Sequence, residues 1–170
     1  MKSLTKKQKD EYLRVHMRHR MTLLRTLRER RVTLGESFKG RGDVYRCVKD
    51  ANLISVRSLM DFLGLCGVRD SDGLRLKKKT RGRGPKYDDD IYLEHFIEHQ
   101  LTPDEVPADQ HEVLAGVYCR ADKELAHLTS TFDDEYNTEE RLIAAASAVE
   151  ALLMRHLFEP LECPAPTIDK

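Results

Sequence analysis

Arg120 and His127 are the two side chains whose types and spacing most clearly suggest chemistry. They lie seven residues apart in the stretch 111–129, so on one helix they point the same way with only ~20° of offset. An arginine fork holds phosphate oxygens, and an imidazole can move a proton near neutral pH. The pair therefore suits a phosphate site. A helix cap, a buried hydrogen bond or an ion pair with a neighbour such as Glu124 is the alternative interpretation.

A helix at about 109–128 must position this pair. Its apolar residues recur at spacings of three and four, which places them on one face: Leu114, Val117, Ala121, Leu125 and Leu128. Arg120 and His127 then lie roughly 110° from the centre of that face, at the edge where the core meets solvent or a partner.

The same periodicity predicts the rest of the fold. The expected helices are 5–31, 43–63, 109–128 and 139–157, with a short one near 90–99. No segment alternates convincingly between apolar and polar residues, so we expect an all-α fold, a helical bundle of four main helices plus one short helix. We expect a single domain over 1–160 and a loose C-terminal tail over 161–170.

A strongly basic stretch interrupts this pattern at about 67–87, where we expect a mobile loop. Its glycines and the mutual repulsion of its charges favour mobility. Five of its side chains are candidates for binding phosphates: Lys77, Lys78, Lys79, Arg81 and Arg83. A flexible loop with no partner is the other interpretation.

Arg57 and Asp61 are a further candidate pair, four residues apart in the second helix. A local ion pair on one helical face is the simplest account of them. If the pair were buried, other groups would have to satisfy it, and it would mark a structural or binding site.

The net charge of zero conceals a division between the two halves. Residues 1–87 hold 24 basic and 9 acidic side chains, and residues 88–170 hold the remaining 5 and 20. Either the halves neutralise each other within the fold or across a homodimer, or the basic half faces an acidic partner such as RNA.

Other classes of site and location find little support. His95 and His99 have a spacing that permits a shared metal, but no third ligand is placed by spacing, so we expect no metal or cofactor. The four cysteines form no CxxC pair and resemble reduced thiols. No stretch is apolar enough to span a membrane and no secretory signal begins the chain, so we expect a cytoplasmic protein without a membrane partner.

Three segments carry a resemblance to a known group of proteins. ISVRSLMDFLG, DDIYLEHF and RADKELAHLT, within about residues 44–129, resemble the RxLLDF-like and NKxxAHLT-like segments of a set of uncharacterised bacterial helical proteins. That set is in turn similar to the HEPN superfamily (higher eukaryotes and prokaryotes nucleotide-binding), which is all-helical.

This resemblance implies a function. Catalytic HEPN members carry Arg, four to six residues and then His, and they cut RNA without metal at a site assembled across a dimer, using the ribose 2′-OH. By that likeness Arg120 would bind the phosphate and His127 would act as general acid or base. The chain would be a metal-independent ribonuclease or toxin-like nuclease. Active members usually have a polar residue after the Arg, whereas this chain has Ala121.

Two other hypotheses stand beside the nuclease. In one, the chain is a non-catalytic helical module that binds nucleic acid or protein through its basic face. In the other, Arg57, Asp61, Arg120 and His127 form an internal polar network with a structural role. The nuclease requires Arg120 and His127 to be open to solvent, whereas the structural role requires them to be covered.

Overall fold

The structure is a computed structural model that describes residues 3–29, 42–80, 90–126 and 138–167. Its helices are α1 (Lys6–Glu11), α2 (Arg18–Glu29), α4 (Gly42–Leu63), α5 (His111–Ala126) and α6 (Glu139–Leu153). A π-helical segment, Tyr12–Met17, joins α1 to α2. These helices confirm the four main helices of the prediction over the described residues.

The first long helix begins where the sequence provides a cap. Thr5 and Gln8 form a capping box, in which the Thr5 hydroxyl accepts from the Gln8 backbone N–H at 3.3 Å and the Gln8 side chain accepts from the Thr5 N–H at 2.9 Å. Its buried residues, at spacings of three and four, face α4 and α6: Met17, Met21, Leu24 and Leu27. The stripe that predicted the helix is therefore the stripe that joins it to the core.

A two-stranded antiparallel sheet makes the all-α prediction wrong in part. Strands β1 (Leu65–Asp70) and β2 (Gly73–Lys78) form a hairpin where we expected a mobile loop over 67–87. Leu65 pairs with Lys78 and Gly67 with Leu76, so these four residues share one face of the ribbon. Leu65 and Leu76 are buried, and α5 packs on both strands. Contact with a helix thus stabilises this ribbon, whose few apolar residues are not evident among the charged residues of its sequence.

The short helix predicted near 90–99 is also wrong, since only a single 3₁₀ turn, Leu93–His95, forms there. Tyr92 before it is extended, and its backbone N–H donates to Nδ1 of His95 at 3.0 Å. Leu93 and Phe96 are buried in the core. The segment therefore follows the core as an irregular chain, with the imidazole replacing a helical hydrogen bond.

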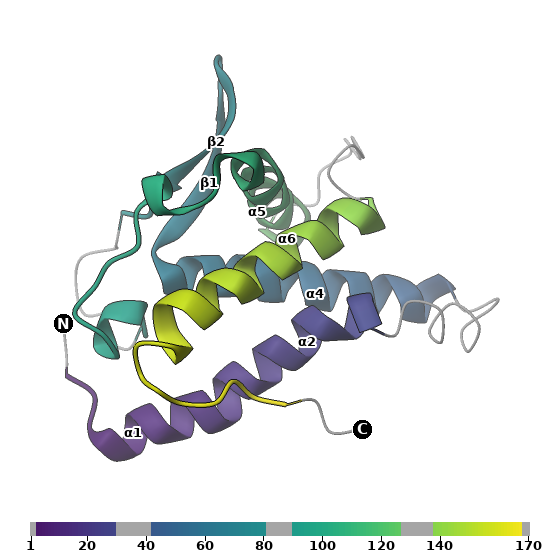
Figure 1. The fold of residues 1–170 in the computed structure, drawn as a ribbon. Coiled ribbons are helices and arrows are strands. Elements are labelled where there is room, and N and C mark those ends of the chain that lie inside the picture. The colour runs from purple at the N-terminus through teal and green to yellow at the C-terminus, as the bar shows by residue number, and fades with distance from the viewer. Residues whose placement is uncertain (1–2, 30–41, 81–89, 127–137, 168–170) are drawn as a thin grey trace.

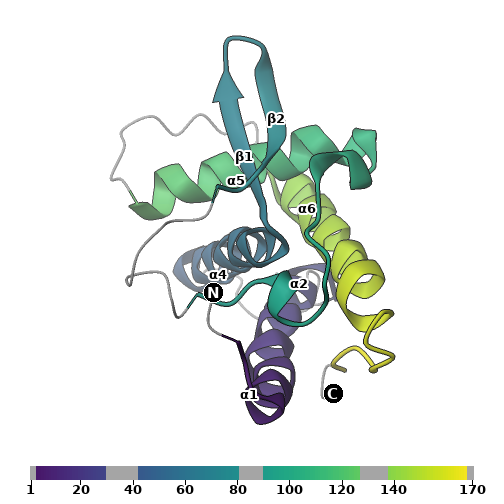
Figure 2. The ribbon, with the colours of Figure 1, turned by 90° about the vertical axis from the view of Figure 1, so that its left-hand side faces the viewer.

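The longer helices lie between α1 and the β1–β2 hairpin. In both views, α1 lies at one end of the molecule and the β1–β2 hairpin projects from the other (Figures 1 and 2). Between them α4 contacts α2, α5 and α6, and α5 contacts both strands. The basic residues of α1 and those of the hairpin therefore lie at opposite ends of the described part of the molecule.

The C-terminal segment returns along the first helix after a π-helical turn, Met154–Phe158. The guanidinium of Arg25 donates to the backbone carbonyl of Pro166 at 2.5 Å. Leu161 and Cys163 are partly buried against the core. The described part of the predicted tail therefore lies against the body of the protein. In the ranges that the structure covers, no helix combines the length and the apolar character that crossing a bilayer requires.

Candidate functional site

Arg120 lies on the buried side of α5. Its side chain is 8% exposed, and Ala121 beside it is fully buried. His127 follows α5 and lies outside the described residues, so the predicted pair of Arg120 and His127 stays a prediction. Within the single chain Arg120 is covered by protein, which is the environment that the structural hypothesis requires.

Arg57 and Asp61 are not partners of each other, contrary to the predicted local ion pair. The guanidinium of Arg57 contacts the carboxylate of Asp122 at 2.6 Å. Asp61 accepts a hydrogen bond from the hydroxyl of Tyr118 at 2.7 Å and pairs with the ammonium of Lys79. The packing of the two helices explains why the predicted pair does not form. α5 crosses α4, and its carboxylate and phenol face the two α4 side chains.

These contacts define a polar cluster at the α4–α5 crossing, made of Arg57, Asp61, Lys79, Tyr118 and Asp122. The Arg57 guanidinium also lies over the Tyr118 ring, 5.8 Å from its centre. The sequence indicated the two residues on α4 and Lys79, but Tyr118 and Asp122 were not predicted as site residues. The available signal was their spacing, since 118 and 122 repeat on α5 the four-residue interval of 57 and 61 on α4.

Tyr118 is the most perturbed group in this polar cluster. Burial of the phenol, followed by its hydrogen bond to Asp61 and the charge of that carboxylate, raises the pKa of Tyr118 far above its ordinary value. The phenol therefore stays protonated and acts as a hydrogen-bond donor. Burial likewise raises the pKa of Tyr12, which stacks on Phe62 with ring centres 5.8 Å apart.

We expect the protein to lose stability as the pH rises above about 10. The folded-state pKa values of Tyr118 and Tyr12 exceed those of the unfolded chain, so the contribution of both phenols is complete below pH ~10 and is lost above it. Urea midpoints measured from pH 8 to pH 11 should fall at the alkaline end. In Tyr118→Phe that fall should be smaller, and an unchanged slope would contradict the assignment.

The outer face of the hairpin continues the polar cluster toward the tip. Cys66 pairs with Lys77 and Val68 with Arg75, so these four residues share the face turned away from α5. Burial raises the pKa of the Cys66 thiol, and the charges of Lys79, Asp61, Lys77 and Asp122 all act on it. Cys66 therefore marks the junction between the outer face and the polar cluster.

The lysines predicted to bind phosphate have different environments. Lys79 is paired with Asp61, whereas Lys77 and Lys78 are exposed and form no ion pair with the residues that the structure describes. They point to opposite faces of β2. Nearer the tip, Arg75 is paired with Asp70, its Nε lying 2.9 Å from the carboxylate. Arg81 and Arg83 lie outside the described residues.

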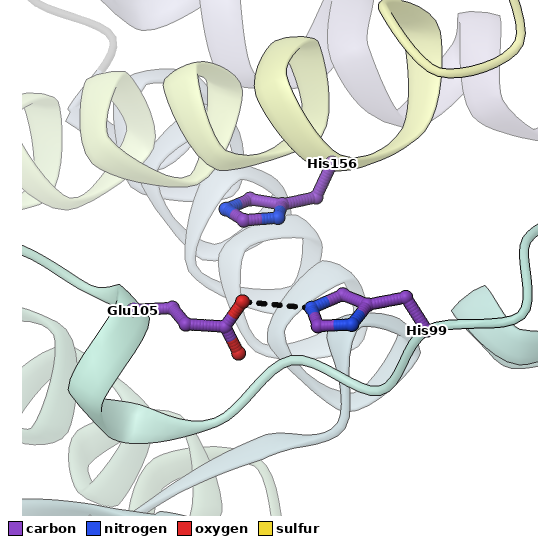
Figure 3. A group of neighbouring side chains, drawn as sticks. All are labelled: His99, Glu105 and His156. Atoms are coloured by element: carbon purple, nitrogen blue, oxygen red, sulfur yellow. Dashed lines mark hydrogen bonds and ion pairs between the residues drawn. The ribbon is translucent and has the colours of Figure 1, made fainter.

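His95 and His99 do not converge as a shared metal site would require. His95 is buried, and its Nδ1 lies 3.0 Å from the Tyr92 backbone nitrogen. His99 instead lies beside Glu105 and His156, which come from two other parts of the chain (Figure 3). His156 lies 57 residues from His99 in the sequence, and Glu105 is not a histidine, so the spacing of His95 and His99 gave no indication of this group.

No family model, curated protein or solved structure matches the chain. The fold and the geometry of the side chains therefore carry the functional argument.

Proposed function

We propose that the chain is a nucleic-acid-binding module that contacts the phosphate backbone through its β1–β2 hairpin. One observation carries the proposal: a ribbon projects from the helical body and presents Lys77 and Lys78 without acidic partners among the described residues (Figure 2). Exposed lysines on such an arm can replace the counterions of a phosphate backbone, and that release favours binding.

The dimensions of the ribbon suit this role. Each strand has six residues, which at ~3.3 Å per residue gives an arm about 20 Å long. A two-stranded ribbon fits the major groove of duplex DNA, which is ~12 Å wide. On the apolar face of the ribbon α5 covers Leu65 and Leu76, while Lys78 stays exposed on that face, so Lys78, the outer face with Lys77 and the tip are the parts available to a partner.

The α4–α5 polar cluster supports the hairpin but does not itself contact the nucleic acid, which is bound by the exposed lysines of the hairpin. Arg57 and Lys79 are already paired with Asp122 and Asp61. Breaking these pairs to reach a phosphate would leave two carboxylates partly buried without partners. The cluster therefore positions the base of the hairpin, and Lys77 and Lys78 provide the free charge.

The test is a double charge reversal, Lys77→Glu with Lys78→Glu. We expect the affinity for single-stranded RNA, duplex RNA or duplex DNA to fall by about 10-fold or more at ~100 mM salt. The slope of log K against log salt should fall by about two, because two phosphate contacts are lost. Fluorescence anisotropy with each nucleic acid over a salt series measures both quantities.

The matched control reverses Lys6 and Lys7, two adjacent exposed lysines at the opposite end of the molecule. It makes the same change in net charge and should retain most of the affinity. Equal losses in the two variants would mean that net charge alone drives binding. Unchanged binding in the hairpin variant would refute the proposal.

An RNA cleavage assay in chelator then separates binding from the ribonuclease activity that the HEPN likeness implies. Cleavage that His127→Ala abolishes would establish the nuclease in addition to binding. Binding without cleavage would identify a non-catalytic module, which the burial of Arg120 favours.

A further inference from the structure

His99, Glu105 and His156 form a compact group of ligand-type side chains that shares no residue with the polar cluster. His99 follows the 3₁₀ turn Leu93–His95, Glu105 ends the 3₁₀ turn Pro103–Glu105, and His156 lies in the π-helical turn Met154–Phe158. Figure 3 shows the two imidazole rings one above the other, with the carboxylate of Glu105 beside them. Their ring centres are 6.0 Å apart, at an angle of 15°.

The separations of the ligand atoms are near those that a metal site requires. One ligand atom from each residue lies within 4.8 Å of the other two. Nε2 of His99 and Oε1 of Glu105 are 2.7 Å apart. In a tetrahedral site with bonds of ~2.0–2.1 Å, neighbouring ligand atoms are about 3.3 Å apart. Small rotations of the partly exposed His99 and Glu105 side chains are enough to reach that spacing.

His156 has a buried ring nitrogen that the hydrogen bonding of the described residues does not satisfy. Its side chain is 8% exposed, and its buried Nε2 has no hydrogen-bond partner in the described part of the chain. Buried polar atoms are normally satisfied, so an imidazole that has an orphaned ring nitrogen and is grouped with a histidine and a carboxylate points to a missing ligand.

The carboxylate of Glu105 is already oriented for coordination. Its Oε2 accepts hydrogen bonds from the backbone N–H of Thr102 at 2.8 Å and from the Thr102 hydroxyl at 2.9 Å. This leaves Oε1 directed at His99. Hydrogen bonds that hold a ligating carboxylate in this way are characteristic of the outer shell of metal sites.

We propose that His99, Glu105 and His156 bind one divalent transition-metal ion of the zinc type. Two imidazoles and one carboxylate are a donor set that zinc accepts, with a fourth position left for water. The side chains of His99 and Glu105 are 47% and 31% exposed, which leaves that position open to solvent. The ion would join the π-helical turn to the segment 99–105, and no hairpin residue is among its ligands.

Titration of the full chain, without a polyhistidine tag and in a thiol-free buffer, with Zn²⁺ alone tests this site. Calorimetry should show one ion per chain, and Zn²⁺ should raise the melting temperature. His99→Gln and Glu105→Gln, both at partly exposed positions, should each weaken binding by at least about 10-fold and remove the thermal shift. His19→Gln, at an exposed histidine on α2, should bind as the wild type does.

Co²⁺ in place of Zn²⁺ provides a spectroscopic readout. We expect the visible bands of a four-coordinate ion with nitrogen and oxygen ligands, and both His99→Gln and Glu105→Gln should abolish them. Thiolate charge-transfer bands would place the ion on cysteines and overturn the proposal. Binding that is not stoichiometric, or that survives both substitutions, would overturn it as well. Nucleic-acid affinity should be the same in His99→Gln and wild type, so failure of this site leaves the proposed function intact.

Discussion

Gly67→Ala is expected to destabilise the fold by about 3 kcal/mol, at the upper end of the cost of overpacking a buried site. A Cβ at Gly67 would lie 2.4 Å from the carbonyl oxygen of Ala115 and 2.7 Å from its Cα. Both are backbone atoms of α5, so no side chain can rotate to make room. The ribbon would have to move off the helix and expose Leu65 and Leu76, which now pack there.

Urea unfolding followed by circular dichroism measures the loss, and Cys66→Ala is the matched control. Cys66 is the neighbouring residue on the opposite face of β1, and alanine at that position adds no atom toward α5. We expect the control to remain within about 0.5 kcal/mol of the wild type. A Gly67→Ala protein as stable as Cys66→Ala would contradict the close backbone contact between the hairpin and α5.

Glu150→Ala should have the second largest effect, a loss of about 2–3 kcal/mol. The carboxylate of Glu150 on α6 accepts hydrogen bonds from the guanidinium groups of Arg25 at 2.6 Å and Arg28 at 2.9 Å, both on α2. The side chains of Arg25 and Glu150 are only 14% and 15% exposed. Removal of the shared carboxylate leaves Arg25 nearly buried without its acidic partner, which costs more than the pair contributed.

Chemical unfolding of the variant at low and high salt measures this cost, with Glu98→Ala as the control at an exposed acidic position. The control should change stability by no more than about 0.5 kcal/mol. Glu150→Gln retains an acceptor and should fall between the two. If Glu150→Ala unfolded at the wild-type midpoint, the contact between α2 and α6 would rest on its apolar residues alone.

The ion pairs resolve part of the charge asymmetry that the sequence presents. Arg25 and Arg28 meet Glu150, and Arg57 meets Asp122, so each of these pairs joins the basic half of the chain to the acidic half. Neutralisation within the fold therefore accounts for some of the basic residues. It leaves out Lys77 and Lys78 on the projecting hairpin, which is why the proposed nucleic-acid contact is assigned to that arm.

The helices were predictable because their signal is local. Met17, Met21, Leu24 and Leu27 follow the period of a helical turn, so a short stretch of sequence carries the information. The hairpin was missed because its stability is not local. β2 offers two apolar residues, Leu74 and Leu76, among lysines and arginines, and their burial depends on a helix that follows much later in the chain.

The sequence alone thus determined four helical segments with their buried stripes, and it identified the residues on α4 and β2 that carry charge. Tertiary structure decided which groups meet. Arg57 pairs with Asp122 and not with Asp61 four residues away, and His99 meets Glu105 and His156 and not His95. The physical reason is that periodicity depends on neighbours within one turn of a helix, whereas a pair of side chains depends on how two distant elements cross.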